Sequence, residues 1–168
     1  ALHRWICESI VISPDNEIAF FTRRIKVQPL GVAWDMSQEK EFFCSSERGA
    51  DGTFPEGKPM ETPPFNMHYN EGGASITIDN KHIYYTVVEQ DGNYDIYYSD
   101  FISNGYGGGE WKEAKSVGNT INSAEHWDSQ PSISADGKTL YFASTRPGGY
   151  GGVDLWKSEK DTEGNWKT

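Results

Sequence analysis

Carboxylates that recur at a fixed spacing are the first residues in this chain whose chemistry could define a function. Asp128 stands just before an expected strand, and its counterpart one repeat earlier is Glu71, or Asn70 if the gap in the alignment lies later. Two carboxylates at a suitable separation can hydrolyse a glycosidic bond. Catalysis needs differentiated acids, however, and these positions are copies, the first falling around Cys7-Glu8. We therefore interpret Asp128 as structural and predict no catalytic residue.

Histidine recurs as well, at His3, His68 and His126. In a closed ring of repeats such residues could surround one mouth of a channel and bind Zn²⁺. Structural zinc needs ligands that converge, and equivalent positions on neighbouring sheets usually lie too far apart. We expect each imidazole to bond a carboxylate of a neighbouring sheet, and we predict no metal and no other cofactor.

Motifs for nucleophilic catalysis and phosphate binding are missing from the sequence. It contains no Gly-x-Ser-x-Gly elbow, and Cys7 and Cys44 form no CxxC motif. The two thiols either pair in an oxidising compartment or pack separately in strands. The glycine-rich stretches 105–109 and 148–152 precede no expected helix, so we interpret them as exposed loops with a central Tyr.

An internal repeat predicts the strands and turns on which these residues lie. The stretch SISADGKTLYF (132–142) matches SITIDNKHIYY (75–85) without gaps, and ISPDNEIAFFT (12–22) is a fainter copy. Each copy reads strand, Asp-Gly or Asp-Asn, strand, which predicts a β-hairpin. Asp79 and Asp136 would then stand in two-residue turns, which demand the positive φ that Asp, Asn and Gly tolerate.

The similarity continues into a third strand, at whose start Asp95 and Asp154 correspond. A carboxylate there can accept backbone N–H bonds from the preceding turn and hold the hairpins together. Each unit thus has about four short strands, with approximate units at 1–60, 61–122 and 123–168, the last incomplete. Four-stranded units at this period are typical of β-propeller blades. The sequence predicts an all-β fold, a β-propeller portion of about three four-stranded antiparallel blades.

Composition and charge exclude some partners. The formal net charge of -10 repels phosphate backbones, so we expect no nucleic acid. No stretch approaches the roughly 18 apolar residues of a membrane span. The chain opens Ala-Leu-His-Arg without an apolar signal core, so we expect any targeting segment to have been removed or to lie outside this sequence.

The stretch WDSQPSISADGKTLYFASTRPGGYGGVDLW (127–156) resembles a known repeat. It is similar to the PD-type, WD-like repeat of the TolB propeller, in the form found in OmpA-family envelope proteins of Bacteroidota. The resemblance is close over 126–168, good over 68–122 and loose over 1–60. It implies a non-catalytic periplasmic propeller, associated with the outer membrane and often linked to a peptidoglycan-binding domain, which this sequence lacks. Such propellers have about six blades, so we expect either a fragment of a longer chain or a half-propeller completed by a partner.

We therefore expect a scaffold for protein–protein interaction with other envelope proteins, as part of a secretion or outer-membrane assembly. Exposed loops with aromatic and Arg side chains are where such folds engage partners, so Tyr106, Arg146 and Tyr150 are the predicted contact residues. The alternative is a carbohydrate-binding or glycoside-hydrolase propeller, because the abundant Trp and Tyr rings could stack on sugars. Self-association of two half-propellers is a third possibility.

Overall fold

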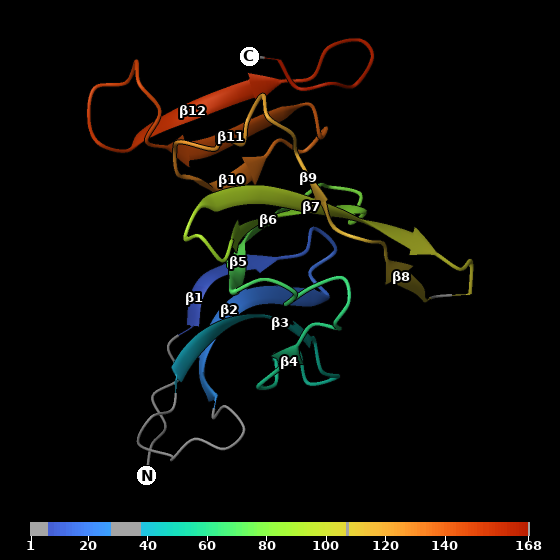
Figure 1. Ribbon diagram of the computed structural model, residues 1–168. Coiled ribbons are helices and arrows are strands. Elements are labelled where there is room, and N and C mark those ends of the chain that lie inside the picture. The colour runs from blue at the N-terminus through green and yellow to red at the C-terminus, as the bar shows by residue number, and fades with distance from the viewer. Residues whose placement is uncertain (1–6, 28–37, 107, 168) are drawn as a thin grey trace.

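Three antiparallel sheets make up the described part of the chain (Figure 1). The computed structural model describes residues 7–27, 38–106 and 108–167. Within these ranges the chain forms strands and turns, and it contains no helix that could cross a membrane. The predicted all-β fold is confirmed.

The strands follow one another in sequence order in the first and third sheets and along the main path of the second, so each of these paths is a meander. The first blade comprises β1 (Cys7–Ile12), β2 (Ile18–Val27), β3 (Gln38–Glu47) and β4 (Lys58–Pro59). The second comprises β5 (Asn70–Ile76), β6 (His82–Val88), β7 (Tyr94–Ser103), β8 (Gly109–Trp111) and β9 (Lys115–Ser116). The third comprises β10 (Asp128–Ile133), β11 (Thr139–Ser144) and β12 (Asp154–Glu159).

The second and third blades depart from a plain four-stranded pattern. Strand β7 pairs with β9 through its first half and with β8 through its second half, so the β7–β8 hairpin projects from the blade (Figure 1). In the third blade a single bridge between Lys160 and Trp166 follows the three strands. The sheets stack so that β1, β5 and β10 contribute to one pocket, described below.

The hairpins that join the first two strands of each blade share one turn. In each, a Ser or Thr hydroxyl donates a hydrogen bond of 2.6 Å to the Asp two residues later: Ser13 to Asp15, Thr77 to Asp79 and Ser134 to Asp136. The residue after the Asp alone has a positive φ: 65° at Asn16, 59° at Asn80 and 70° at Gly137. The predicted two-residue turn was therefore wrong. The Asp stays at negative φ and serves as a hydrogen-bond acceptor.

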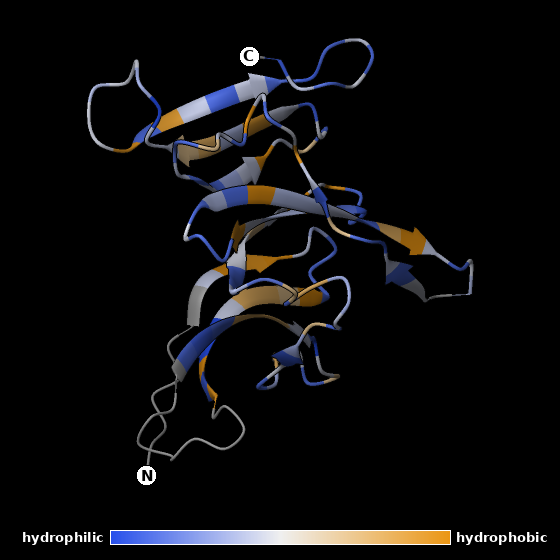
Figure 2. Ribbon diagram, in the orientation of Figure 1, coloured by the Kyte–Doolittle hydropathy of each residue, from blue (hydrophilic) through white to orange (hydrophobic). Residues whose placement is uncertain are grey.

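Apolar side chains fill the two spaces between blades. The first cluster includes Phe20 and Phe43 from the first blade and Ile83, Tyr85 and Val87 from the second. Phe43 stacks on Tyr85 with ring centroids 5.5 Å apart and planes at 15°. Figure 2 shows that hydrophobic stretches follow the strands, whereas the connecting loops are mostly hydrophilic.

The second space is filled in the same way. Tyr84 and Ile96 of the second blade meet Ile133, Leu140 and Phe142 of the third. Alternate residues of β6 therefore serve opposite junctions, because successive side chains of a strand point to opposite faces. A blade between two others therefore buries apolar side chains on both of its faces.

We predict that Phe43→Ala lowers the free energy of unfolding by about 3–5 kcal/mol, because it removes a fully buried ring from the first junction. Urea titration followed by tryptophan fluorescence measures the change. Tyr106→Ala, on the exposed β7–β8 loop, is the control and should stay within about 0.5 kcal/mol of the parent. A loss below about 1 kcal/mol for Phe43→Ala would contradict this packing.

Candidate functional site

The connections between blades are held by asparagine. The Asn66 side chain accepts the N–H of Phe43 (2.8 Å) and donates to the Phe43 carbonyl (3.0 Å). Asn122 makes the same pair of bonds with Ile96, both at 2.9 Å. Phe43 and Ile96 occupy equivalent positions in the third strands of successive blades. Each Asn side chain therefore ties the segment between two blades to the third strand of the preceding blade.

A buried carboxylate fixes the other end of the first connection. Glu71, at the start of β5, accepts the N–H groups of Asn66 (2.6 Å), Met67 (2.7 Å) and His68 (2.9 Å). It also bonds the His68 ring, with Nδ1 2.9 Å from Oε1. These bonds replace the water that the buried charge has lost.

Asp128 takes the same place at the start of β10, but it has different partners. Its carboxylate is fully buried, accepts the N–H of Ser123 (2.8 Å) and pairs with the Arg146 guanidinium at 2.7 Å. An acid so enclosed cannot reach a glycosidic oxygen in solvent. Glu71 and Asp128 therefore act as anchors for the backbone.

Sequence analysis missed Asn66 and Asn122. A signal was present, because each Asn follows a large apolar residue and precedes a buried carboxylate by five or six positions. The one-residue difference in that spacing hides the match in an ungapped alignment.

The structure does not bring the three predicted contact residues together. Arg146 donates to Asp128 and to the Ile121 carbonyl, and its guanidinium lies over the Phe142 ring at 4.8 Å. It belongs to the blade junction. Tyr106 and Tyr150 are fully exposed, but they lie in the β7–β8 and β11–β12 loops, which project on opposite sides of the molecule (Figure 1).

The other predicted positions are Asp95 and Asp154, at the starts of β7 and β12, and His126. Asp154 accepts the N–H of Gly151 (3.0 Å) within the preceding loop. Asp95 instead accepts a bond from the Asn93 side chain (3.2 Å). His126 is half-buried in the second connection. His3 lies outside the described residues, as does the Cys7 side chain, so pairing of Cys7 with the buried Cys44 stays a prediction.

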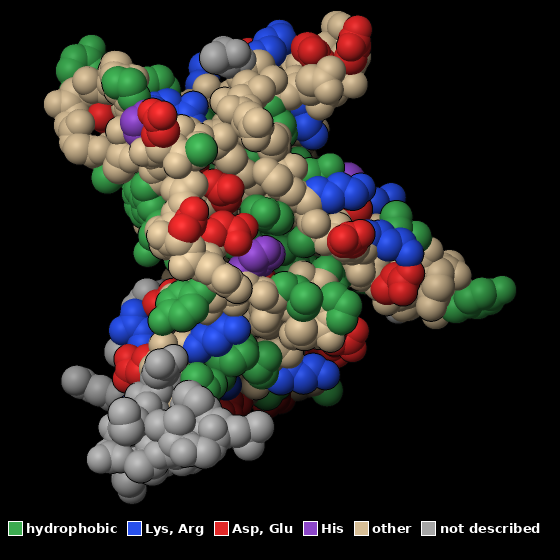
Figure 3. Space-filling model, viewed as in Figure 1, with side chains coloured by type: hydrophobic (Ala, Val, Ile, Leu, Met, Phe, Trp, Pro, Cys, Tyr) green, Lys and Arg blue, Asp and Glu red, His purple; other side chains and the backbone are tan. Residues whose placement is uncertain are grey.

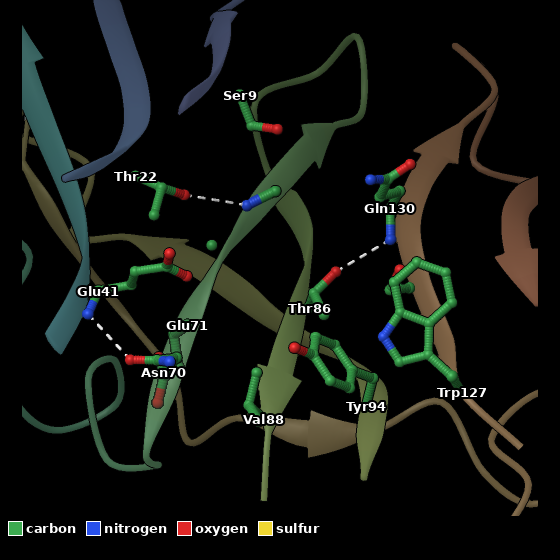
Figure 4. Close-up of a pocket in the computed structure, with 13 residues that line it drawn as sticks. Ser9, Thr22, Glu41, Asn70, Glu71, Thr86, Val88, Tyr94, Trp127 and Gln130 are labelled. Atoms are coloured by element: carbon green, nitrogen blue, oxygen red, sulfur yellow. Dashed lines mark hydrogen bonds between the residues drawn. The ribbon is translucent and has the colours of Figure 1, made fainter. Parts of the chain in front are cut away.

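A polar pocket of about 260 Å³ opens where the three innermost strands meet (Figure 4). Each of these strands has a β-bulge, and the bulge residue has a left-handed conformation: φ is 51° at Ser9, 62° at Gly73 and 51° at Gln130. All three bulge residues line the pocket. We call it the axial pocket.

Threonines of the second strands tie the bulges to the neighbouring blade. The N–H of Gly73 donates to Thr22 Oγ1 (3.2 Å), and the N–H of Gln130 donates to Thr86 Oγ1 (3.0 Å) (Figure 4). Gly72 permits the first approach, because a Cβ at this position would overlap the Thr22 hydroxyl. The bulges therefore keep the blades in register around the pocket.

One wall of the axial pocket is aromatic. Tyr94 and Trp127 pack edge to face with centroids 5.3 Å apart (Figure 4). The opposite wall carries Glu41 and Asn70, where the Glu41 N–H donates to Asn70 Oδ1 at 2.9 Å. Because the Gln130 side chain is exposed in this pocket, an incoming ligand would meet an amide and two rings.

Acidic side chains gather beside a histidine on the face shown in Figure 3. Glu89 lies 3.7 Å from His68 Nε2. Burial, followed by the charges of Glu89, Asp128 and Asp91, raises the pKa of Asp95. This part of the surface has a negative potential. Within the described ranges no group of three His, Cys, Asp or Glu side chains is placed to hold a metal ion.

Comparisons with known proteins bear on the fold. No protein-family model matches the chain, and no curated protein does. Among solved structures, the chain is similar to the crystal structure of TolB from Acinetobacter baumannii, with 18% identity and a TM-score of 0.53 over 94% of this chain and 30% of that one. A putative TolB from Agrobacterium tumefaciens shares 16% identity, with a TM-score of 0.44 over 92% and 58%.

The first similarity, together with the stacked antiparallel sheets, confirms the predicted fold class. The chain is a portion of a β-propeller, and it spans under a third of the Acinetobacter protein. The predicted connection to OmpA-family proteins of Bacteroidota stays a prediction.

We predict that Arg146→Ala lowers the free energy of unfolding by about 3–5 kcal/mol, because it leaves the buried Asp128 carboxylate without its cation. Lys157→Ala removes the exposed ion pair with Glu159 and should cost less than about 1 kcal/mol. Urea titration measures both. Equally small losses of unfolding free energy in the two variants would contradict the anchoring role and leave Arg146 as a predicted contact residue.

Asp95 should make stability depend on pH. A carboxyl whose pKa is higher in the folded state binds more protons there between its two pKa values, so stability falls as pH rises through that window. Asp95→Asn removes the half-buried charge, and the new amide oxygen can still accept the bond from Asn93. We expect the variant to melt at a higher temperature than the parent at pH 7. The gap should close towards about pH 4, and a gap that widens on acidification would refute the assignment.

Proposed function

We propose that this chain is a non-catalytic, protein-binding part of a β-propeller in the bacterial cell envelope. One observation carries the proposal. The two acids that recur in the repeat, Glu71 and Asp128, hold backbone, and the axial pocket, which Glu41 and Glu71 also line, presents amides, hydroxyls and aromatic rings. Groups of this kind bind a polar segment without transforming it.

The charge distribution indicates the kind of partner. The net charge of -10 and the acidic side chains beside His68 favour a partner surface with Lys and Arg, because complementary potentials speed association and suppress wrong partners. The aromatic pair at Tyr94 and Trp127 supplies an anchor of the type found at interface hot spots.

The periplasm, next to the outer membrane, is the proposed location, and a secretion or outer-membrane assembly is the proposed context. Support comes from the resemblance of residues 127–156 to an envelope repeat and from the TolB-like fold.

A glycan is the second candidate ligand. It is favoured by the Tyr94–Trp127 pair beside the side-chain amides of Asn70 and Gln130, since rings stack on sugars and amides bond their hydroxyls. This candidate uses the same pocket and requires no acid catalyst.

Two variants of the axial pocket test the proposal. Trp127→Ala removes the aromatic anchor, and Gln130→Gly deletes a side chain at a φ of 51° that glycine adopts freely. With an envelope protein captured on the immobilised chain and then purified, we expect Trp127→Ala to weaken its binding about 30-fold, the effect of a hot spot. Calorimetry measures the Kd, and thermal melting checks the fold.

The loop variants Tyr106→Ala and Tyr150→Ala are the matched controls, because both side chains are fully exposed and neither lines the pocket. They should bind as the parent does. Loss of binding in the loop variants alone would move the contact to the loop tips. Binding to a glycan array that Trp127→Ala abolishes, with no protein captured, would favour the second candidate.

A further inference from the structure

The two buried carboxylates that begin the inner strands β5 and β10 differ in the side chain that pairs with them. Asp128 is paired with the Arg146 guanidinium at 2.7 Å. Glu71 is paired instead with His68, whose Nδ1 lies 2.9 Å from Oε1, and within the described ranges it has no Lys or Arg partner. Arginine stays charged at any physiological pH, whereas histidine changes its charge between about pH 5 and 8. The charge balance around Glu71 therefore depends on pH.

The repeat shows that the second blade has lost its permanent cation. Glu89 stands where Arg146 stands one blade later, because each follows by two residues the β-sheet partner of the buried acid. An acid in place of an arginine would leave two carboxylates facing each other. The ring of His68 lies between Glu71 and Glu89 and separates them.

The surroundings of the His68 ring are acidic. Nε2 lies 3.7 Å from Glu89 Oε1, which is an ion-pair distance, while Nδ1 bonds Glu71. The ring packs on Tyr97 with centroids 5.1 Å apart, and the Tyr97 hydroxyl donates to Glu89 at 3.1 Å. Asp91, in the same turn as Glu89, is the other charged residue that lines the hollow beside the ring. Each of these charged neighbours favours a positive ring.

The proton on the ring decides how Glu89 is held. An ionised carboxylate only accepts hydrogen bonds, so the Nδ1 beside Glu71 carries a proton in both states of the ring. In the neutral ring Nε2 is then an acceptor, and its lone pair faces the oxygens of Glu89. In the charged ring Nε2 is a donor, and both glutamates are attracted. Protonation therefore turns an unfavourable contact with Glu89 into a favourable one.

Glu89 begins the turn that joins β6 to β7. Its N–H donates to the Asn93 carbonyl at 2.9 Å, and its own carbonyl accepts the N–H of Gly92 at 3.0 Å. The Asn93 side chain donates to the backbone of the second connection at 3.2 Å. The next residue, Tyr94, packs on Trp127 in the axial pocket (Figure 4). The position of Glu89 therefore bears on the aromatic wall of that pocket.

We propose that His68 is a pH-dependent bridge between the first connection (residues 60–69) and the β6–β7 turn. At about pH 5.5 the charged ring holds Glu71 and Glu89 together, and the turn keeps Tyr94 against Trp127. At about pH 7.5 the neutral ring keeps its bond to Glu71 alone, and the turn loosens. The consequence for ligand binding rests on the function proposed for the axial pocket, whereas the bridge itself does not.

Hydrogen exchange at the Gly92 amide measures the bridge, because this N–H is bonded within the turn. NMR gives its protection factor, corrected for the pH dependence of exchange in an unfolded chain. We expect protection to be about threefold to tenfold higher at about pH 5.5 than at about pH 7.5, the effect of one partly exposed, charge-assisted contact. The nuclear Overhauser effect between the rings of Tyr94 and Trp127 should weaken as the pH rises through the same range.

Two variants remove the pH dependence by different routes. His68→Gln keeps a donor for Glu71 but carries no charge at any pH, so Gly92 should be equally protected at both pH values. Glu89→Gln should behave likewise, because its amide group can donate to the neutral ring and accept from the charged one. Because Glu89 is partly exposed, this variant decides the question if His68→Gln does not fold.

A second histidine and the neighbouring titratable groups provide the controls. His126→Gln should keep the pH dependence of the parent, because no carboxylate pairs with that ring among the described side chains. Burial, followed by the charge of Glu89, raises the pKa of Tyr97 to about 12, so its hydroxyl stays neutral in this range. Asp95, whose pKa is raised, is unchanged in His68→Gln, and any pH effect left in that variant belongs to it.

The outcomes separate the parts of the proposal. Protection of Gly92 that does not vary with pH, or that varies equally in His68→Gln, would overturn the bridge. Protection that varies while the Tyr94–Trp127 contact stays constant would overturn the connection to the axial pocket. A chain that captures no envelope protein would refute the proposed function, yet the exchange measurements would still decide on His68.

Discussion

The buried carboxylate at the start of an inner strand is the interaction on which the rest of the structure depends. Glu71 gathers three consecutive backbone N–H groups, and Asp128 gathers one N–H and a guanidinium. Removing a charge from water is costly unless such partners replace the water. The connection can therefore adopt few conformations, and the next blade must start where the carboxylate is satisfied.

The same arrangement decides the character of the axial pocket. Glu71 and Asp128 bond the connections, and the pocket is walled by bulged backbone, amides, the Tyr94–Trp127 pair and two glutamates, Glu41 and Glu71. The bulge N–H groups of Gly73 and Gln130 are already bound by threonines of the neighbouring blade. A site of this kind can hold a ligand through its shape and its polar rim, which suits recognition more than acid–base chemistry.

Each blade depends on its neighbours to bury its apolar side chains. Every internal face buries aromatic and branched side chains, and the same residue types stand exposed at Leu155 and Ile10. Apolar area on a blade face gains stability only when another sheet covers it.

The sequence by itself determined where the hairpins lie, the number of sheets and the all-β class, although the turn type of the hairpins differed from the prediction. Turn chemistry such as Thr77 bonding Asp79 acts between neighbours, and a repeat copies it faithfully. Tertiary structure alone decided that Arg146 is an anchor, since its partners Ile121 and Asp128 lie 25 and 18 residues away. It also separated Tyr106 from Tyr150 and made Asn122 clamp Ile96 across 26 residues. Bonds between residues so far apart in the sequence form only once the blades have packed. The spacing of nearby residues does not show which distant side chains will meet.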